Sequence, residues 1–161
     1  MKKLEGFTVI ELLIAAAIGL ISLGVLYGFY QAELKTYQFN KKRMEVIDEL
    51  WLTMDKIEKE VREGKEFKSC AEFPLSIPPD SLVFATNDTA TIAFFTSGDT
   101  ALYRMVSTSL SAQTIAVGVA ISAVTSPSGS CQISLTKNWT YRGMNKEESI
   151  SSQIHLRNWG R

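Results

Sequence analysis

The first apolar run of the chain covers residues 7–30 and contains one charged side chain, Glu11. As a helix this run would be about 36 Å long, whereas the hydrocarbon core of a bilayer is roughly 30 Å thick. Lys2 and Lys3 precede the run, and the residues just after it carry no net charge. The pattern therefore predicts one membrane-spanning helix, with its N-terminus in the cytoplasm and the rest of the chain exported.

Residues 31–63 continue the helical pattern without a proline or glycine. Apolar side chains recur there every three or four residues: Tyr37, Met44, Ile47, Leu50, Trp51, Met54, Ile57 and Val61. Gly64 is the expected C-cap, so we predict one helix of about 57 residues, roughly 85 Å long. The apolar stripe could form a coiled coil, but the β-rich sequence after it favours packing of this amphipathic half on a sheet.

From residue 64 onward the pattern changes to short segments rich in β-branched and aromatic residues. Pro74, Pro78 and Pro79 first predict an irregular connection. The predicted strands are 82–85, 91–96, 101–107, 115–119, 121–125, 133–136 and 153–157, with a hairpin turn at Ser97-Gly98-Asp99. We therefore predict an α+β fold, in which a long N-terminal helix packs on an antiparallel β-sheet head formed by residues 64–161.

Composition narrows the classes of function. Seventeen basic and 17 acidic side chains balance, which excludes the large positive charge of many nucleic-acid-binding proteins. Local aromatic and basic groups remain compatible with single-stranded nucleic acid or a protein partner: Tyr103-Arg104, Trp139 with Tyr141-Arg142, and Arg157 with Trp159 and Arg161. The one histidine, His155, has no nucleophile motif beside it, so we expect no catalytic site.

Three interpretations compete for the first thirty residues. A secretory signal has a shorter apolar core than residues 7–30 and ends in a small-residue cleavage site. A plain signal anchor explains the length but leaves Gly6 and Glu11 without a role, although a carboxylate is costly within a membrane-spanning helix. The third interpretation is that residues 1–6 are a leader peptide that is cut off before the apolar run.

The residues Gly6-Phe7-Thr8-Val9-Ile10-Glu11-Leu12-Leu13 favour this third interpretation, because they resemble the class III signal of type IV pilins and pseudopilins. The resemblance implies that prepilin peptidase cleaves between Gly6 and Phe7 and methylates the new amine of Phe7. It also implies that Glu11 assists assembly with other pilin or pseudopilin subunits on an inner-membrane platform. An acid buried in an apolar helix bundle needs a cationic partner, so we expect Glu11 to pair with the Phe7 amine of a neighbouring subunit.

The remainder of the chain resembles PilW-type minor pilins and the J pseudopilin of type II secretion. The similar positions are Arg43-Met44 to Val61-Arg62, the 92–95 strand with Tyr103-Arg104, and Arg157-Asn158. Many major pilins have a kink-forming proline where this chain has Gly28. The resemblance implies an inner-membrane protein that later joins a periplasmic or extracellular filament. The alternatives are a secretion pseudopilus subunit and a permanently anchored binding or enzymatic domain.

Two further chemical features lie in the predicted head. Cys70 and Cys131 would both be exported, where oxidising conditions allow a disulfide between them; two free thiols are the alternative. Asp80, Asp88 and Asp99 could contribute to a calcium site such as some pseudopilins possess, but their spacing does not match an EF-hand. We expect no cofactor.

Overall fold

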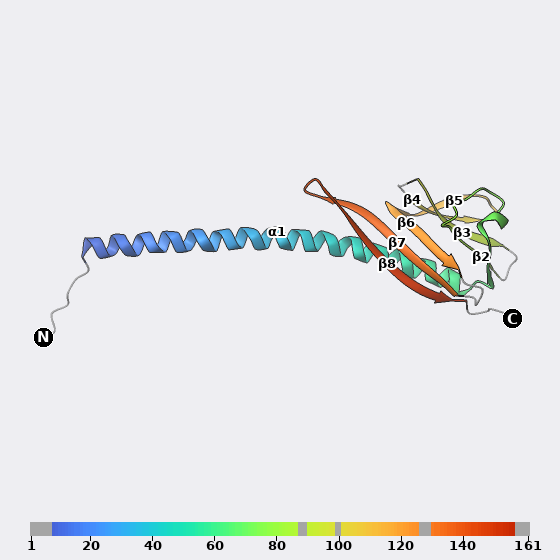
Figure 1. The fold of residues 1–161 in the computed structure, drawn as a ribbon, viewed down its shortest axis with the longest axis horizontal. Helices are drawn as coiled ribbons and strands as arrows, with labels where there is room; N and C mark the ends of the chain where they lie inside the picture. The colour runs from blue at the N-terminus through green and yellow to red at the C-terminus, as the bar shows by residue number, and fades with distance from the viewer. Residues whose placement is uncertain (1–7, 87–89, 99–100, 126–129, 157–161) are drawn as a thin grey trace. The chain divides into compact units, whose positions relative to one another are not determined.

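The computed structural model describes residues 8–86, 90–98, 101–125 and 130–156. Its first element is the helix α1, Val9–Arg62, and eight strands follow (Figure 1). The strands are β1 (Glu66–Phe67), β2 (Leu82–Ala85), β3 (Thr91–Ser97), β4 (Ala101–Val106), β5 (Ala112–Val117), β6 (Val119–Thr125), β7 (Ser130–Tyr141) and β8 (Met144–His155). The α+β prediction is confirmed, and the fold is consistent with that of pilins.

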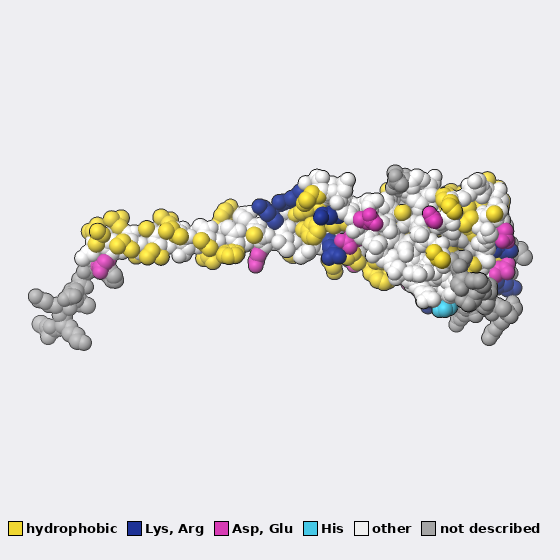
Figure 2. Space-filling model, viewed as in Figure 1, with side chains coloured by type: hydrophobic (Ala, Val, Ile, Leu, Met, Phe, Trp, Pro, Cys, Tyr) yellow, Lys and Arg dark blue, Asp and Glu magenta, His cyan; other side chains and the backbone are white. Residues whose placement is uncertain are grey.

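The chain divides into two compact units, residues 1–42 and 43–161. The first unit consists of the N-terminal part of α1. Its apolar run is long and apolar enough to cross a membrane, with a mean hydropathy of 2.5 in its best window, none of it buried inside the protein. Figure 2 shows apolar side chains covering this part of the helix.

The second unit is the head, and it contains two antiparallel sheets where one was predicted. The strand order is β1-β2-β3-β4-β5 in the first sheet and β6-β7-β8 in the second. Gly118 separates β5 from β6 with a φ of 71°, and Val119, which the sequence pattern placed in the preceding strand, begins β6. A positive φ is accessible to glycine at little cost, so Gly118 lets the chain pass from one sheet to the other.

The two sheets also contact each other through β6. The backbone N–H of Ile121 donates to Thr96 Oγ1 at 2.9 Å, and that of Ala123 donates to the Asp80 carbonyl at 3.3 Å. β6 is therefore tied both to β3 and to the connection that precedes β2.

The core of the head is formed by one face of α1 and the inner faces of the sheets. The buried helix residues are Val46, Leu50, Thr53, Met54, Ile57 and Val61. Trp51 was predicted to share this face, but it points away from the core and is 52% exposed. Met44 and Leu52 are exposed to a similar extent. Successive helical residues are about 100° apart, and Trp51 falls outside the arc, from Thr53 to Met54, that the sheets cover.

Gly64 lies just after the end of α1, where the C-cap was expected, but not in the left-handed conformation that is common there, because its φ is not among the positive values found in the described residues. Its backbone N–H donates to the Val61 carbonyl at 2.9 Å. A Cβ at this position would lie 2.8 Å from Phe84 Cδ2 and 3.0 Å from the Val61 oxygen. The glycine is needed because β2 approaches the helix end too closely for a side chain.

The last two strands are much longer than predicted. Each has 12 residues, and together they form a hairpin that is paired from Ser130↔His155 to Tyr141↔Met144. Its two-residue turn is Arg142-Gly143, with φ angles of 51° and 78°, the geometry of a type I′ turn. The predicted end of the last strand, Arg157, lies outside the described residues.

Candidate functional site

The first turn of α1 carries the candidate assembly carboxylate. Thr8 is the last non-helical residue, and Glu11 Oε2 accepts hydrogen bonds from the Thr8 N–H and from Thr8 Oγ1, both at 2.9 Å. The Glu11 N–H in turn donates to Thr8 Oγ1 at 3.3 Å. These reciprocal bonds form a capping box, which satisfies backbone donors that a helix start leaves unpaired.

The capping box explains how an acid is held at the start of an apolar helix. The two donors of Thr8 offset part of the cost of placing the Glu11 carboxylate in an apolar environment. The partial positive charge at the N-terminus of a helix favours an acid in this position as well. Both residues remain exposed on the helix surface, so a further cationic group can reach the carboxylate.

The predicted cleavage position, Gly6 and Phe7, lies outside the described residues. Apart from Glu11, the helix presents mostly apolar side chains to its surroundings, from Val9 (79% exposed) to Tyr30 (58% exposed). α1 continues through Gly28, and a Cβ there would have no neighbour within 4 Å. Apart from Glu11, residues 9–30 thus offer a largely apolar helix surface, which a bilayer or the helices of other subunits can cover.

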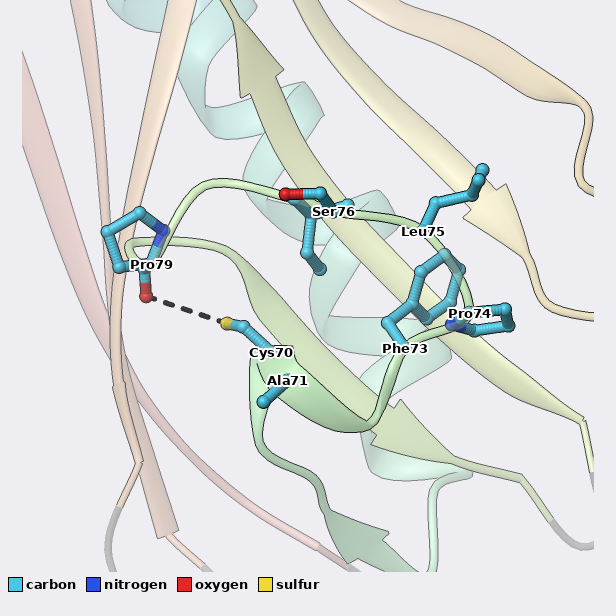
Figure 3. A pocket seen from close by; sticks show the side chains of 8 residues that line it. Cys70, Ala71, Phe73, Pro74, Leu75, Ser76 and Pro79 are labelled. Carbon is cyan, nitrogen blue, oxygen red and sulfur yellow. Dashed lines mark hydrogen bonds between the residues drawn. The ribbon is translucent and has the colours of Figure 1, made fainter.

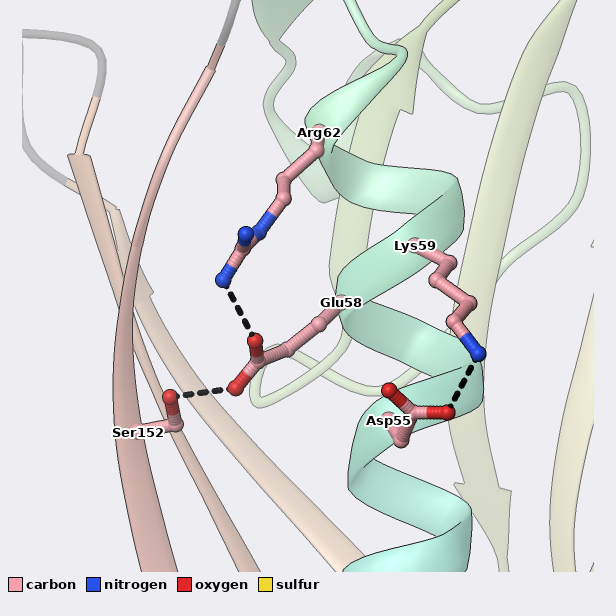
Figure 4. A network of polar contacts seen from close by, with 5 residues as sticks. All are labelled: Asp55, Glu58, Lys59, Arg62 and Ser152. Atoms are coloured by element: carbon pink, nitrogen blue, oxygen red, sulfur yellow. Dashed lines mark hydrogen bonds and ion pairs between the residues drawn. The ribbon is translucent and has the colours of Figure 1, made fainter.

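Ion pairs and hydrogen bonds fasten the β7–β8 hairpin to the head part of α1. Arg43 contacts both carboxylate oxygens of Glu148, at 2.6 and 3.2 Å, and this contact raises the pKa of the Arg43 guanidinium. Lys137 lies 2.5 Å from Glu49. Figure 4 shows the far end of the hairpin, where Ser152 donates to Glu58 at 2.5 Å.

The first sheet is tied to the same helix segment. Arg104 of β4 pairs with Glu60 at 2.7 Å, while Arg62 pairs with Glu58 at 2.8 Å, one turn before it on the helix (Figure 4). Both sheets are therefore held on the same helix segment, residues 43–62, within the head.

Cys70 and Cys131 are both free in the structure, which is the second of the two alternatives for this pair. Figure 3 shows the Cys70 thiol directed at the Pro79 carbonyl, to which it donates at 3.5 Å, and it lies 3.4 Å from the Ser81 carbonyl. Cys131 is fully buried in β7, and this burial raises the pKa of its thiol to about 11. Each thiol therefore has its own surroundings, and the Cys70 thiol faces backbone oxygens instead of a second sulfur.

The groups of aromatic and basic residues noted in the sequence make different contacts in the head. Tyr103 stacks on Phe95 with 5.7 Å between ring centroids, while Arg104 is engaged with Glu60. Trp139 is 7% exposed and meets the edge of Tyr141, whose ring lies 5.5 Å beneath the Arg142 guanidinium. Contacts within the head therefore engage the first two groups: ring packing and an ion pair hold Tyr103 and Arg104, and ring contacts join Trp139, Tyr141 and Arg142. The third group, from Arg157 to Arg161, lies outside the described residues.

The remaining candidates are not gathered into one site. His155 is exposed at the end of β8, and Asp80 is exposed in the connection before β2. Asp88 and Asp99 lie outside the described residues. Within the described part of the chain, no three His, Cys, Asp or Glu side chains are placed to hold a metal ion together.

Sequence reasoning missed two features. The first is the capping box, whose usual sequence signature is the Thr-x-x-Glu spacing that Thr8 and Glu11 have. The second is a shallow hollow on the outer face of α1, lined by Asp48, Trp51, Leu52 and Asp55. The sequence feature that could have predicted this hollow is the run of three large apolar residues, Leu50, Trp51 and Leu52. Three successive helical positions cannot all face one sheet, so part of this run has to be exposed.

Comparison with known proteins gives one match. Residues 1–27 match the family model described as the prokaryotic N-terminal methylation motif. Searches of curated proteins and of solved structures found no match. The matched segment contains Gly6, Phe7, Thr8 and Glu11, and together with the long apolar helix and the β-rich head it supports a type IV pilin-like or pseudopilin subunit, a structural protein that is processed by prepilin peptidase.

Proposed function

We propose that this chain is a minor pilin or pseudopilin, a structural subunit of a type IV pilus-like filament. The observation that carries the proposal is the methylation motif over residues 1–27, with the Glu11 carboxylate capped in the first turn of an otherwise apolar, exposed helix. In this proposal prepilin peptidase cuts after Gly6 and methylates Phe7. The processed subunit then remains anchored in the membrane until it is incorporated into a filament.

The role of Glu11 follows from the change of surroundings on assembly. In the membrane, Thr8 and headgroups or water at the bilayer surface can stabilise its carboxylate. Inside a bundle of apolar helices only the capping bonds remain, and an acid there needs a cation. The amine that cleavage creates on Phe7 of a neighbouring subunit supplies that charge and sets the stagger between adjacent helices.

The head has a binding or positioning role in this proposal, and its mechanism is assembly without turnover. The positive-inside rule places it on the far side of the inner membrane, in the periplasm or outside the cell. Assignment to the minor class rests on the resemblance of residues 43–62 and 92–104 to PilW-type minor pilins and the J pseudopilin.

The first experiment follows an epitope-tagged full-length chain in cells that carry its peptidase and assembly platform. We expect a shortened, methylated chain in the sheared filament fraction. Glu11→Ala should still be cleaved but should be lost from that fraction. Glu11→Gln is the matched variant, because it keeps the capping acceptor and removes the charge.

If the charge pairs with a neighbouring amine, Glu11→Gln fails as Glu11→Ala does. If only the cap matters, Glu11→Gln assembles normally, which would refute the pairing. A chain that keeps residues 1–6 and never leaves the membrane would instead support a permanently anchored domain. Loss of secretion without loss of surface filaments, on deletion of the chain, would place it in a secretion pseudopilus.

A further inference from the structure

An exposed apolar surface lies on the outer face of the head part of α1. Trp51 and Leu52 are 52% and 65% exposed, and with Asp48 and Asp55 they line the shallow hollow; we name these four residues the helix patch. Asp55 also pairs with Lys59 at 2.6 Å. A tryptophan bounded by carboxylates is suited to a partner that brings an apolar group together with a cation.

The turn of the β7–β8 hairpin has this chemistry. Residues 141–146, which we name the hairpin tip, contain two cations, Arg142 and Lys146, and no acid. Met144 is 53% exposed beside them, and the Arg142 guanidinium lies 5.5 Å from the centroid of the Tyr141 ring. The type I′ turn holds these side chains on a defined backbone.

The helix patch and the hairpin tip of one molecule lie on opposite sides of the Arg43–Glu148 pair along the helix. The Arg43–Glu148 pair fixes where the hairpin crosses the helix. The tip extends from this pair in one direction, while the patch lies about 13 Å away in the other. With strands rising about 3.3 Å per residue, the total separation along the helix is up to roughly 30 Å.

We propose that the hairpin tip of one copy docks on the helix patch of a second copy that is displaced along the helix axis. Asp48 and Asp55 form ion pairs with Arg142 and Lys146. Met144 packs on Trp51, since thioether groups pack favourably against aromatic rings. The two surfaces differ, so the contact is heterologous: it leaves a free patch at one end and a free tip at the other, and can repeat.

This inference rests on the proposed function and makes it more specific. Both anchors would enter the same membrane in the same direction, so neighbouring copies lie parallel, as the displaced contact requires. A contact between copies also means that this subunit enters the filament in runs of two or more, instead of as isolated copies.

The test is a charge exchange in the tagged full-length chain. Asp48→Lys and Arg142→Glu should each lower the amount in the sheared filament fraction about fivefold to tenfold, because each places like charges across the contact. The double variant should restore most of it. Glu63→Lys makes the same charge change on an exposed acid outside the patch and should have no effect.

A second measurement identifies the partner directly. A photoreactive amino acid in place of Leu52, in cells with two differently tagged copies, should cross-link one tag to the other within residues 141–146. Normal assembly of both single variants, or cross-links only to other proteins, would overturn the contact. If the unmodified chain is itself uncleaved and absent from filaments, the proposed function fails first.

Discussion

Replacing Leu50 with alanine tests how the head is held on the helix, because Leu50 is fully buried between α1 and the sheets. Truncation of a buried leucine leaves a cavity and costs about 2–5 kcal/mol. Leu52→Ala is a close control: it is the same substitution two residues later in the same helix, but at a side chain that is 65% exposed. Both variants change helix propensity equally, by a few tenths of a kcal/mol.

The assay is thermal unfolding of the purified full-length chain in detergent, followed by near-ultraviolet circular dichroism of the head. For a head of this size we expect Leu50→Ala to lower the melting temperature by about 10–15 °C, and Leu52→Ala by about 2 °C or less. Equal losses in the two variants, or a larger loss for Leu52→Ala, would refute the assignment of the buried and exposed helix faces.

Further predictions concern the head. Gly64→Ala should destabilise it by about 1–3 kcal/mol in chemical denaturation, because a Cβ would lie 2.8 Å from a Phe84 ring carbon. Gly143→Val should destabilise the hairpin in hydrogen exchange, since φ at Gly143 is 78° and a β-branched residue is strained there. At pH 8 the buried Cys131 thiol, with its pKa raised to about 11, should be alkylated far more slowly than Cys70, and its burial should cost stability only as the pH rises from about 9 towards 11.

Each of these predictions has a result that contradicts it. An unchanged denaturation midpoint for Gly64→Ala would mean that β2 does not approach the helix end as described. Unchanged exchange along β7 and β8 in Gly143→Val would remove the two-residue turn. Equal alkylation rates for the two cysteines in the folded chain would show that Cys131 is accessible, and failure of both to react would point to a disulfide.

The helix and the buried strands could be predicted from the sequence because the local spacing of apolar residues indicates which of their side chains are buried. Leu82–Ala85 was predicted with the bounds that β2 has, since three of its four side chains are buried. The last strand was predicted as only 153–157, because residues 144–152 are mostly polar and exposed. Those residues are held in the strand by pairing with β7 and by long-range contacts such as Arg43–Glu148, which no local pattern reveals.

The candidate site was predicted only in part, for a similar reason. Glu11 was recognisable because a single acid in an apolar run is unusual. The face on which Trp51 lies depends on which neighbouring residues the sheets cover, and Leu50 and Trp51 both fit an apolar stripe at three- and four-residue spacing. The two-sheet head likewise depends on Gly118, whose positive φ follows from the path of the chain and not from its neighbours in sequence.

The most direct test of processing and assembly is the mass of the chain recovered from sheared filaments, with sequencing of its N-terminal peptide. We expect that this chain begins at Phe7, carries one methyl group on the Phe7 amine and retains Glu11 in an unmodified state. A chain that begins at Met1 and is found only in the membrane fraction, in cells that process other prepilins, would contradict it.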